Sequence, residues 1–243
     1  MAAFAGDAPY VGKWKENLAK SDYRETTVTY EQLPSGEMKE TDEGRSYTFR
    51  VDGKEYTDQW GWKAVWKANG SNSWTCDWSV NGKHQSTDTL TLSADGKALT
   101  ILSKGKNQNN EPWETTIVMD RVSGSAGLAG KWKYKNSKTT SPAFMVLSAN
   151  GPDGLKWEFP NDHSVCDIKL DGKPYPCTSP TMAKPIQIEV SKVDDRTLNL
   201  KFLMDGQLGF QATYTVSADG KTLTESGVST GSGENVKIVY ERQ

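Results

Sequence analysis

The stretch VGKWKENLAKS, residues 11–21, returns as AGKWKYKNSKT at residues 129–139. Three further segments return in the same order: VDGKEY (51–56) as LDGKPY (170–175), LSADGKALT (92–100) as VSADGKTLT (216–224), and IVMDR (117–121) as IVYER (238–242). Ordered repetition of this kind indicates a duplicated structural unit. We therefore expect two domains, residues 10–122 and 131–243, joined by SGSAGLAG at 123–130, whose small residues are typical of a flexible linker.

Each copy has the pattern of short β-strands. Segments such as SWTCDWSV (73–80) and TDTLTLS (87–93) alternate apolar and polar residues, and Asp-Gly, Asn-Gly and Ser-Gly pairs separate them. About eight to ten strands in roughly 110 residues is the spacing of an antiparallel barrel or sandwich, and a barrel leaves no exposed edge. We predict an all-β protein made of two tandem antiparallel barrels of about eight to ten strands each.

Composition narrows the class of partner. The 243 residues include 29 basic and 31 acidic side chains, a formal charge of -2, and neither sign forms a long run, so nucleic acid is not an expected partner. No apolar run approaches the roughly 20 residues that cross a bilayer, which predicts a soluble chain without a transmembrane segment. Ala3-Phe4-Ala5 matches the remains of an A-x-A-type cleavage site, so we expect a secreted or periplasmic mature protein; an ordinary cytoplasmic N-terminus is the alternative.

The cysteines bear on the same question. A two-residue turn at Asp171-Gly172 would place Cys166 directly opposite Cys177 on neighbouring strands, close enough for a disulfide after modest adjustment. Two reduced thiols are the alternative, but an exported protein meets an oxidising compartment, so we favour the bridge. Cys76 is expected to be a small core residue.

The ends of the two copies resemble the calycin superfamily, which includes the lipocalins and fatty-acid-binding proteins. Those proteins carry Gly-x-Trp on the first strand and a basic residue near the end of the last strand that packs across the Trp. Here Gly12-Lys13-Trp14 would pair with Arg121, and Gly130-Lys131-Trp132 with Arg242. More narrowly, the chain is similar to short secreted lipocalin-like proteins of unknown role from soil bacteria.

The resemblance implies a barrel that encloses a small-molecule cavity. It departs from the fatty-acid-binding proteins at Ile117 and Ile238, which stand where their carboxylate-binding Arg would be. Too few residues follow Trp14 for their helical lid, so capture of fatty acids by that device is not expected.

The two copies differ in the residues predicted to face inward. The second copy is filled with aliphatic and aromatic residues and should mainly support the first. The first copy carries four indoles and three polar groups, which we predict to form a ligand pocket: Trp62, Trp66, Trp74, Trp78, His84, Ser86 and Asp88. Placing His84 inside requires an irregularity near the Asn81-Gly82 turn, and the second copy requires the same at Asp205-Gly206 to bury Leu208 and Phe210.

These residues favour a binder of a small apolar, aromatic or ring-bearing molecule, and the oligomeric state stays open. The alternatives are indoles that simply fill the barrel, a protein-interaction module, a carbohydrate-binding module, and a calycin-like isomerase, cyclase or hydrolase using His84 and Asp88 as acid–base groups. Metal sites have little support because the only histidines are His84 and His163, with no Cys-x-x-Cys. Glycine-rich nucleotide loops are absent from this strand pattern, so we expect no cofactor.

Overall fold

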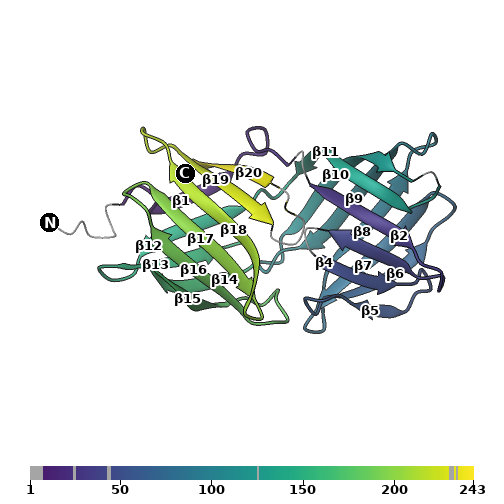
Figure 1. The fold of residues 1–243 in the computed structure, drawn as a ribbon, viewed down its shortest axis with the longest axis horizontal. Helices are drawn as coiled ribbons and strands as arrows, with labels where there is room; N and C mark the ends of the chain where they lie inside the picture. The colour runs from purple at the N-terminus through teal and green to yellow at the C-terminus, as the bar shows by residue number, and fades with distance from the viewer. Residues whose placement is uncertain (1–7, 24–25, 43–44, 125, 230–232, 234) are drawn as a thin grey trace. The chain divides into compact units, whose positions relative to one another are not determined.

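The computed structural model describes residues 8–23, 26–42, 45–124, 126–229, 233 and 235–243. These residues form twenty β-strands, and no helix occurs among them (Figure 1). Consequently, the described part of the chain offers no helix of the length and apolarity that would cross a membrane. The Ala3-Phe4-Ala5 stretch, on which the prediction of export rests, lies outside the described residues.

The chain divides into two compact units, and unit 2 is the continuous segment Tyr23–Ser141. It is a ten-stranded, barrel-like antiparallel sheet with the order β4-β3-β2-β11-β10-β9-β8-β7-β6-β5. Its strands are β2 (Thr27–Gln32), β3 (Met38–Asp42), β4 (Arg45–Phe49), β5 (Glu55–Thr57), β6 (Lys63–Ala68), β7 (Ser73–Val80), β8 (Lys83–Leu92), β9 (Ala98–Lys106), β10 (Pro112–Ser123) and β11 (Gly130–Thr139).

Unit 1 combines the residues up to Asp22 with Pro142–Gln243. It is a closed ten-stranded barrel that begins with β1 and continues from β12 through β20. Its strands are β1 (Gly12–Glu16), β12 (Phe144–Ala149), β13 (Gly154–Phe159), β14 (Ser164–Lys169), β15 (Asp171–Thr178), β16 (Ile186–Lys192), β17 (Thr197–Met204), β18 (Gln207–Val216), β19 (Thr222–Ser229) and β20 (Asn235–Arg242). The predicted fold class, two tandem antiparallel β-barrels, is confirmed.

The boundaries of the units differ from those of the sequence repeats. β1 pairs with β12 and β20, whereas β11 pairs with β10 and β2. The segment 123–130, expected to link two domains, instead connects β10 to β11 inside unit 2. Adjacent strands joined by a short loop close at small entropic cost, which favours β11 over the sequence-distant β1 as the partner of β10. The chain passes between units at Asp22/Tyr23 and Ser141/Pro142.

The tryptophan–arginine pairs are consequently exchanged relative to the prediction. Arg242 lies over the ring of Trp14, and Arg121 lies over the ring of Trp132. Each Gly-x-Trp glycine has a positive φ, and a Cβ at Gly12 would collide with the guanidinium of Arg242. Glycine is therefore required at this position of the motif, because the arginine reaches its indole across the glycine backbone.

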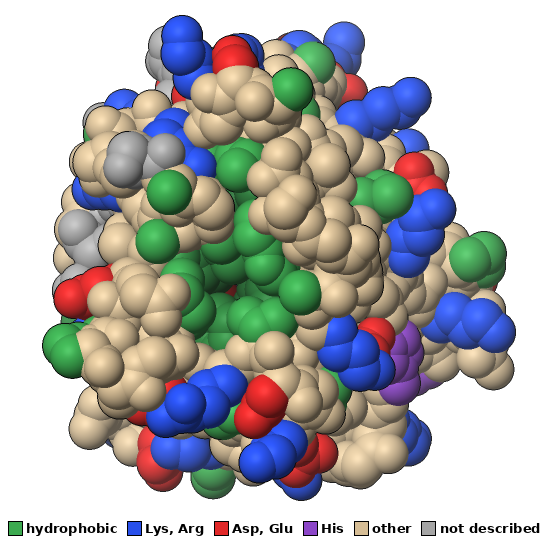
Figure 2. Space-filling model, turned by 90° about the vertical axis from the view of Figure 1, so that its right-hand side faces the viewer, with side chains coloured by type: hydrophobic (Ala, Val, Ile, Leu, Met, Phe, Trp, Pro, Cys, Tyr) green, Lys and Arg blue, Asp and Glu red, His purple; other side chains and the backbone are tan. Residues whose placement is uncertain are grey.

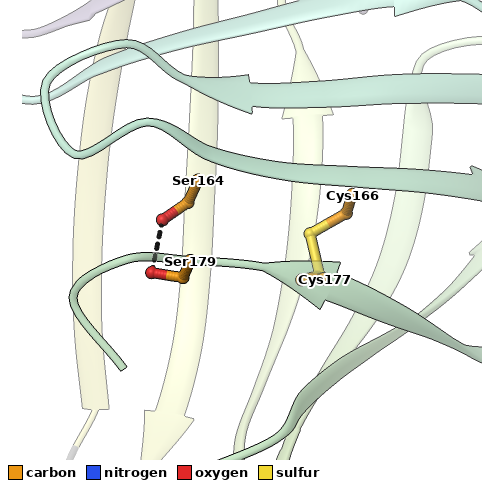
Figure 3. Close-up of a disulfide and its surroundings, with 4 residues drawn as sticks. All are labelled: Ser164, Cys166, Cys177 and Ser179. Carbon is orange, nitrogen blue, oxygen red and sulfur yellow. Dashed lines mark hydrogen bonds between the residues drawn. A yellow bond between two sulfur atoms is a disulfide. The ribbon is translucent and has the colours of Figure 1, made fainter. Parts of the chain in front are cut away.

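Cys166 and Cys177 form the expected cross-strand disulfide between β14 and β15 (Figure 3). The register places the two residues directly opposite each other, with 4.3 Å between their Cα atoms. Nearby, the hydroxyl of Ser164 donates to the hydroxyl oxygen of Ser179 across 2.8 Å (Figure 3). Together these contacts tie β14 to the segment that follows it. Cys76 is free and buried, as predicted.

Candidate functional site

The indoles of unit 2 gather on the inner face of β6 and β7. Trp66, Trp74 and Trp78 are buried, and Trp62 is half-buried against the same core. Trp66 stacks on Phe49 with 4.4 Å between ring centroids, and Trp62 meets Trp78 edge to face at 6.4 Å. Strict alternation along β7 explains this arrangement, because every second side chain of a strand points to the same face. The four predicted tryptophans therefore belong to one aromatic interior.

A β-bulge decides which polar residues of β8 face inward. The register pairs Trp78 with Ser86 and Ser79 with His84, so Gln85 is the extra residue; the irregularity lies within β8, and not at the Asn81-Gly82 turn where burial of His84 would require it. Gln85 and Ser86 are buried, whereas the side chain of His84 is 56% exposed. The prediction that His84 faces the interior is wrong, because the bulge lies between His84 and the inward-facing Ser86 and places His84 on the outer face. Leu208, in the second copy, is likewise exposed.

On the outer face, His84 has partners of its own. Its Nε2 lies 3.1 Å from the hydroxyl oxygen of Thr87 and 3.9 Å from a carboxylate oxygen of Asp77. Asp88 points to the opposite face of the strand, toward Trp78. His84 and Asp88, the acid–base groups named for the enzymatic alternative, therefore lie on opposite faces of β8.

Asp88 supplies a carboxylate to the aromatic interior. The indole Nε1 of Trp78 donates to Asp88 Oδ2 across 2.9 Å, and Ser103 provides a second hydrogen bond. Burial raises the pKa of Asp88, and these two hydrogen bonds oppose the increase. Asp88 and Ser86, two of the three predicted polar residues, thus lie at the wall that the indoles form.

Sequence reasoning missed a second buried acid, Glu40, on β3. Tyr47 donates to Glu40 Oε2 across 3.2 Å, and Trp66 Nε1 donates to the hydroxyl oxygen of Tyr47 across 2.8 Å. Burial raises the pKa of Glu40 to about 7, because desolvation outweighs the attraction of Arg45. The alternation in MKETD, with Glu40 in phase with the buried Met38, is the signal that could have identified it.

Arg45 supplies a positive charge beside the acidic side chains of this interior. Its guanidinium pairs with Glu40 at 2.8 Å, with Asp42 at 3.4 Å and with Asp58 at 3.6 Å. The same group lies 4.9 Å from the centroid of Trp78, within the range of a cation–π interaction. One half-buried cation therefore joins β3, β4 and the loop after β5 to the indole cluster.

Asp58 organises that loop. Its Oδ1 accepts hydrogen bonds from the backbone N–H groups of Trp60 and Trp62, across 2.9 and 2.8 Å. The side chain of Asp58 is fully buried, and its other oxygen faces Arg45. The orientation of Trp62 at the edge of the cluster thus depends on a carboxylate that no sequence motif indicated.

The surface of unit 2 is hollowed where hydrophobic side chains gather. Figure 2 shows this hollow, with hydrophobic side chains on its walls and backbone, polar and charged groups around its rim. An apolar concavity with few polar groups is the usual composition of a small-molecule site. Among the described residues, no three His, Cys, Asp or Glu side chains come together as a metal site requires. Comparison with models of known families, with curated proteins and with solved structures found no match to this chain.

Proposed function

We propose that unit 2 binds a small apolar, aromatic or ring-bearing molecule, in the manner of a lipocalin-like carrier. The observation that carries this proposal is the hydrogen bond from Trp78 to Asp88 within a wall of buried indoles. Filling a barrel needs no carboxylate, and an unpaired buried polar group costs roughly 1–3 kcal/mol. A carboxylate kept at an aromatic wall is instead suited to orienting a ligand.

The chemistry of the wall defines the class of ligand. Indole faces offer wide apolar contact to planar or ring-shaped molecules, and Trp62, at the half-buried edge, is placed to contact a molecule as it enters. Asp88 and Ser86 would accept hydrogen bonds from polar substituents of the ligand. The hollow on the surface of unit 2 supports this proposal, since a completely filled sheet would present no apolar concavity (Figure 2).

We also propose that the protein works outside the cytoplasm. The Cys166–Cys177 bridge supports this, because disulfides persist in oxidising compartments such as the periplasm and the extracellular space. A carrier of apolar molecules is useful in such a compartment, since it keeps poorly soluble compounds in aqueous solution. Fractionation of cells that express the full-length gene, followed by immunodetection, tests the location directly.

Tryptophan fluorescence tests the binding proposal. The purified protein is titrated with a panel of lipids, aromatic compounds and oligosaccharides, and we expect quenching or a blue shift with members of the aromatic or lipid class. Asp88→Asn should weaken binding of the responding compound, because it removes a charged acceptor from the wall. His84→Ala is the matched control on the same strand and should leave affinity unchanged. A response to none of the compounds, or equal loss in both variants, would contradict the proposal.

A further inference from the structure

The interior of unit 1 also contains a buried carboxylate, although its sequence predicts an apolar filling. Glu225 on β19 is 5% exposed and lies within the barrel. The hydroxyl groups of Tyr214 and Tyr240 donate to Glu225 Oε2 across 2.7 and 3.1 Å. The interior of unit 1 is therefore not wholly apolar, because it holds an acid where an aliphatic residue would have packed.

The described residues of unit 1 provide no cation for this acid. Among the ion pairs of the described residues none includes Glu225, and the charged side chain that acts on it, Glu16, is itself an acid. In unit 2, Arg45 supplies the positive charge beside the buried acid Glu40. Arg45 lies two residues before Tyr47 on β4, which is the third strand from the Gly-x-Trp strand β11 in the order of the sheet. The third strand from the Gly-x-Trp strand of unit 1 is β14, and its burial pattern matches Cys166 with Tyr47. The position equivalent to Arg45, two residues before Cys166, is therefore Ser164. The compensating guanidinium of one unit is thus missing from the other.

Besides the acid without a counter-ion, the described part of this interior contains an indole N–H without a hydrogen-bond partner. Trp157 is fully buried, and its indole Nε1 has no hydrogen-bond partner among the described residues. Its ring meets that of Tyr214 edge to face, with 5.2 Å between centroids, so the indole neighbours the tyrosine that holds Glu225. An orphan donor of this kind is costly unless another molecule supplies the acceptor.

We propose that unit 1 holds a second ligand site, for a small ring-bearing organic cation that also carries a hydroxyl group. The ammonium group of the ligand would donate to Glu225, forming a charge-assisted hydrogen bond away from bulk water. The hydroxyl oxygen would accept from Trp157 Nε1, and the faces of Trp157 and Tyr214 would pack against the ring. Indole and phenol faces also attract an ammonium ion directly. Both uncompensated groups of the interior are satisfied by one molecule.

A matched series of three compounds tests this site in the wild-type protein by isothermal titration calorimetry at neutral pH. Tyramine carries both the ammonium and the hydroxyl group, 2-phenylethylamine lacks the phenolic hydroxyl, and tyrosol replaces the ammonium group with a neutral alcohol. We expect tyramine to bind best, with about a ten-fold loss of affinity for tyrosol, the order expected for one charge-assisted hydrogen bond. No binding of tyramine, as when a buried water molecule satisfies both groups, or equal affinity for tyramine and tyrosol, would overturn the proposal.

Variants locate the site in unit 1. Glu225→Gln should lower the affinity for tyramine about ten-fold and leave tyrosol unchanged, whereas Glu40→Gln, the buried acid of unit 2, should change neither. Trp157→Phe should remove the advantage of tyramine over 2-phenylethylamine. The wild-type series keeps the proposal testable if Glu225→Gln does not fold. Sensitivity to Glu40→Gln but not to Glu225→Gln or Trp157→Phe would place tyramine in unit 2 and sink this proposal without affecting the one for unit 2.

Discussion

The guanidinium of Arg242 lies 4.2 Å from the centroid of the Trp14 ring, although the two residues belong to different copies of the sequence repeat. Arg242 also donates to the carbonyl oxygens of Gly220 and Val11, across 2.7 and 2.8 Å. The strand that opens the chain is thereby held in unit 1, and unit 2 is inserted between β1 and β12. Stability of unit 1 consequently depends on residues at both ends of the chain.

Trp14→Ala should destabilise unit 1 and leave unit 2 folded. Loss of a fully buried tryptophan typically costs about 3–5 kcal/mol, and here it also removes the surface on which Arg242 packs. Hydrogen exchange measured by mass spectrometry should show loss of protection in β12 and β20, the neighbours of β1. Trp132→Ala is the matched control and should instead expose β2 and β10. Loss of protection in β10 on changing Trp14 would contradict the observed pairing.

Reduction of Cys166–Cys177 should destabilise unit 1 by about 3 kcal/mol, the value expected from the entropy of a short closed loop. Denaturant unfolding of the wild-type protein should shift to a lower midpoint when a reductant is present. A Cys166→Ser/Cys177→Ser double variant should show the lower midpoint without reductant and no further change with it. Cys76 is free in the folded protein, so a reductant effect that persists in the double variant would disagree with this assignment.

Arg45→Met should destabilise unit 2 by about 3–5 kcal/mol, because it leaves Glu40 and Asp58 buried without their cation. Adding Glu40→Gln to this variant should recover part of the loss, since one uncompensated acid is then removed. A double-mutant cycle from urea unfolding of the single and double variants measures the coupling. Simple additivity of the two changes would show that the 2.8 Å pair contributes no coupling to stability.

Stability should fall as the pH rises from about 4.5 to about 7. Burial raises the pKa of Glu40 to about 7, whereas an unfolded Glu titrates near 4.3. Between these values the folded state holds more protons than the unfolded state, so the free energy of unfolding decreases with pH. The difference in pKa corresponds to about 4 kcal/mol.

Urea unfolding across this pH range measures the effect. Glu40→Gln should make the decline of the unfolding free energy with pH less steep. Burial also raises the pKa values of Asp88 and Glu225, and their contribution to the decline should be the same in both proteins. Equal slopes in the wild-type protein and Glu40→Gln would contradict the raised pKa of Glu40.

Much of the architecture could be predicted from local patterns. Alternation from Trp74 to Val80 determines which side chains of β7 face inward, because successive residues of a strand point to opposite faces. The Cys166–Cys177 pair could likewise be predicted, because both cysteines flank one tight turn. Both inferences need only residues that are near one another in the sequence.

The tertiary structure alone decided the long-range choices. The two Gly-x-Trp strands, β1 and β11, begin with the same four residues, so either could pair with β10. The short connection from β10 to β11, rather than any residue of the motif, selects β11 as the partner. The bulge at Gln85 that turns His84 outward shifts the register by one residue, and the alternation of apolar and polar residues does not predict where such a shift occurs. The partners of Glu40, Arg45 and Glu225 come from different strands. The cost of burying each charge, and the group that offsets it, therefore became visible only in the assembled sheets.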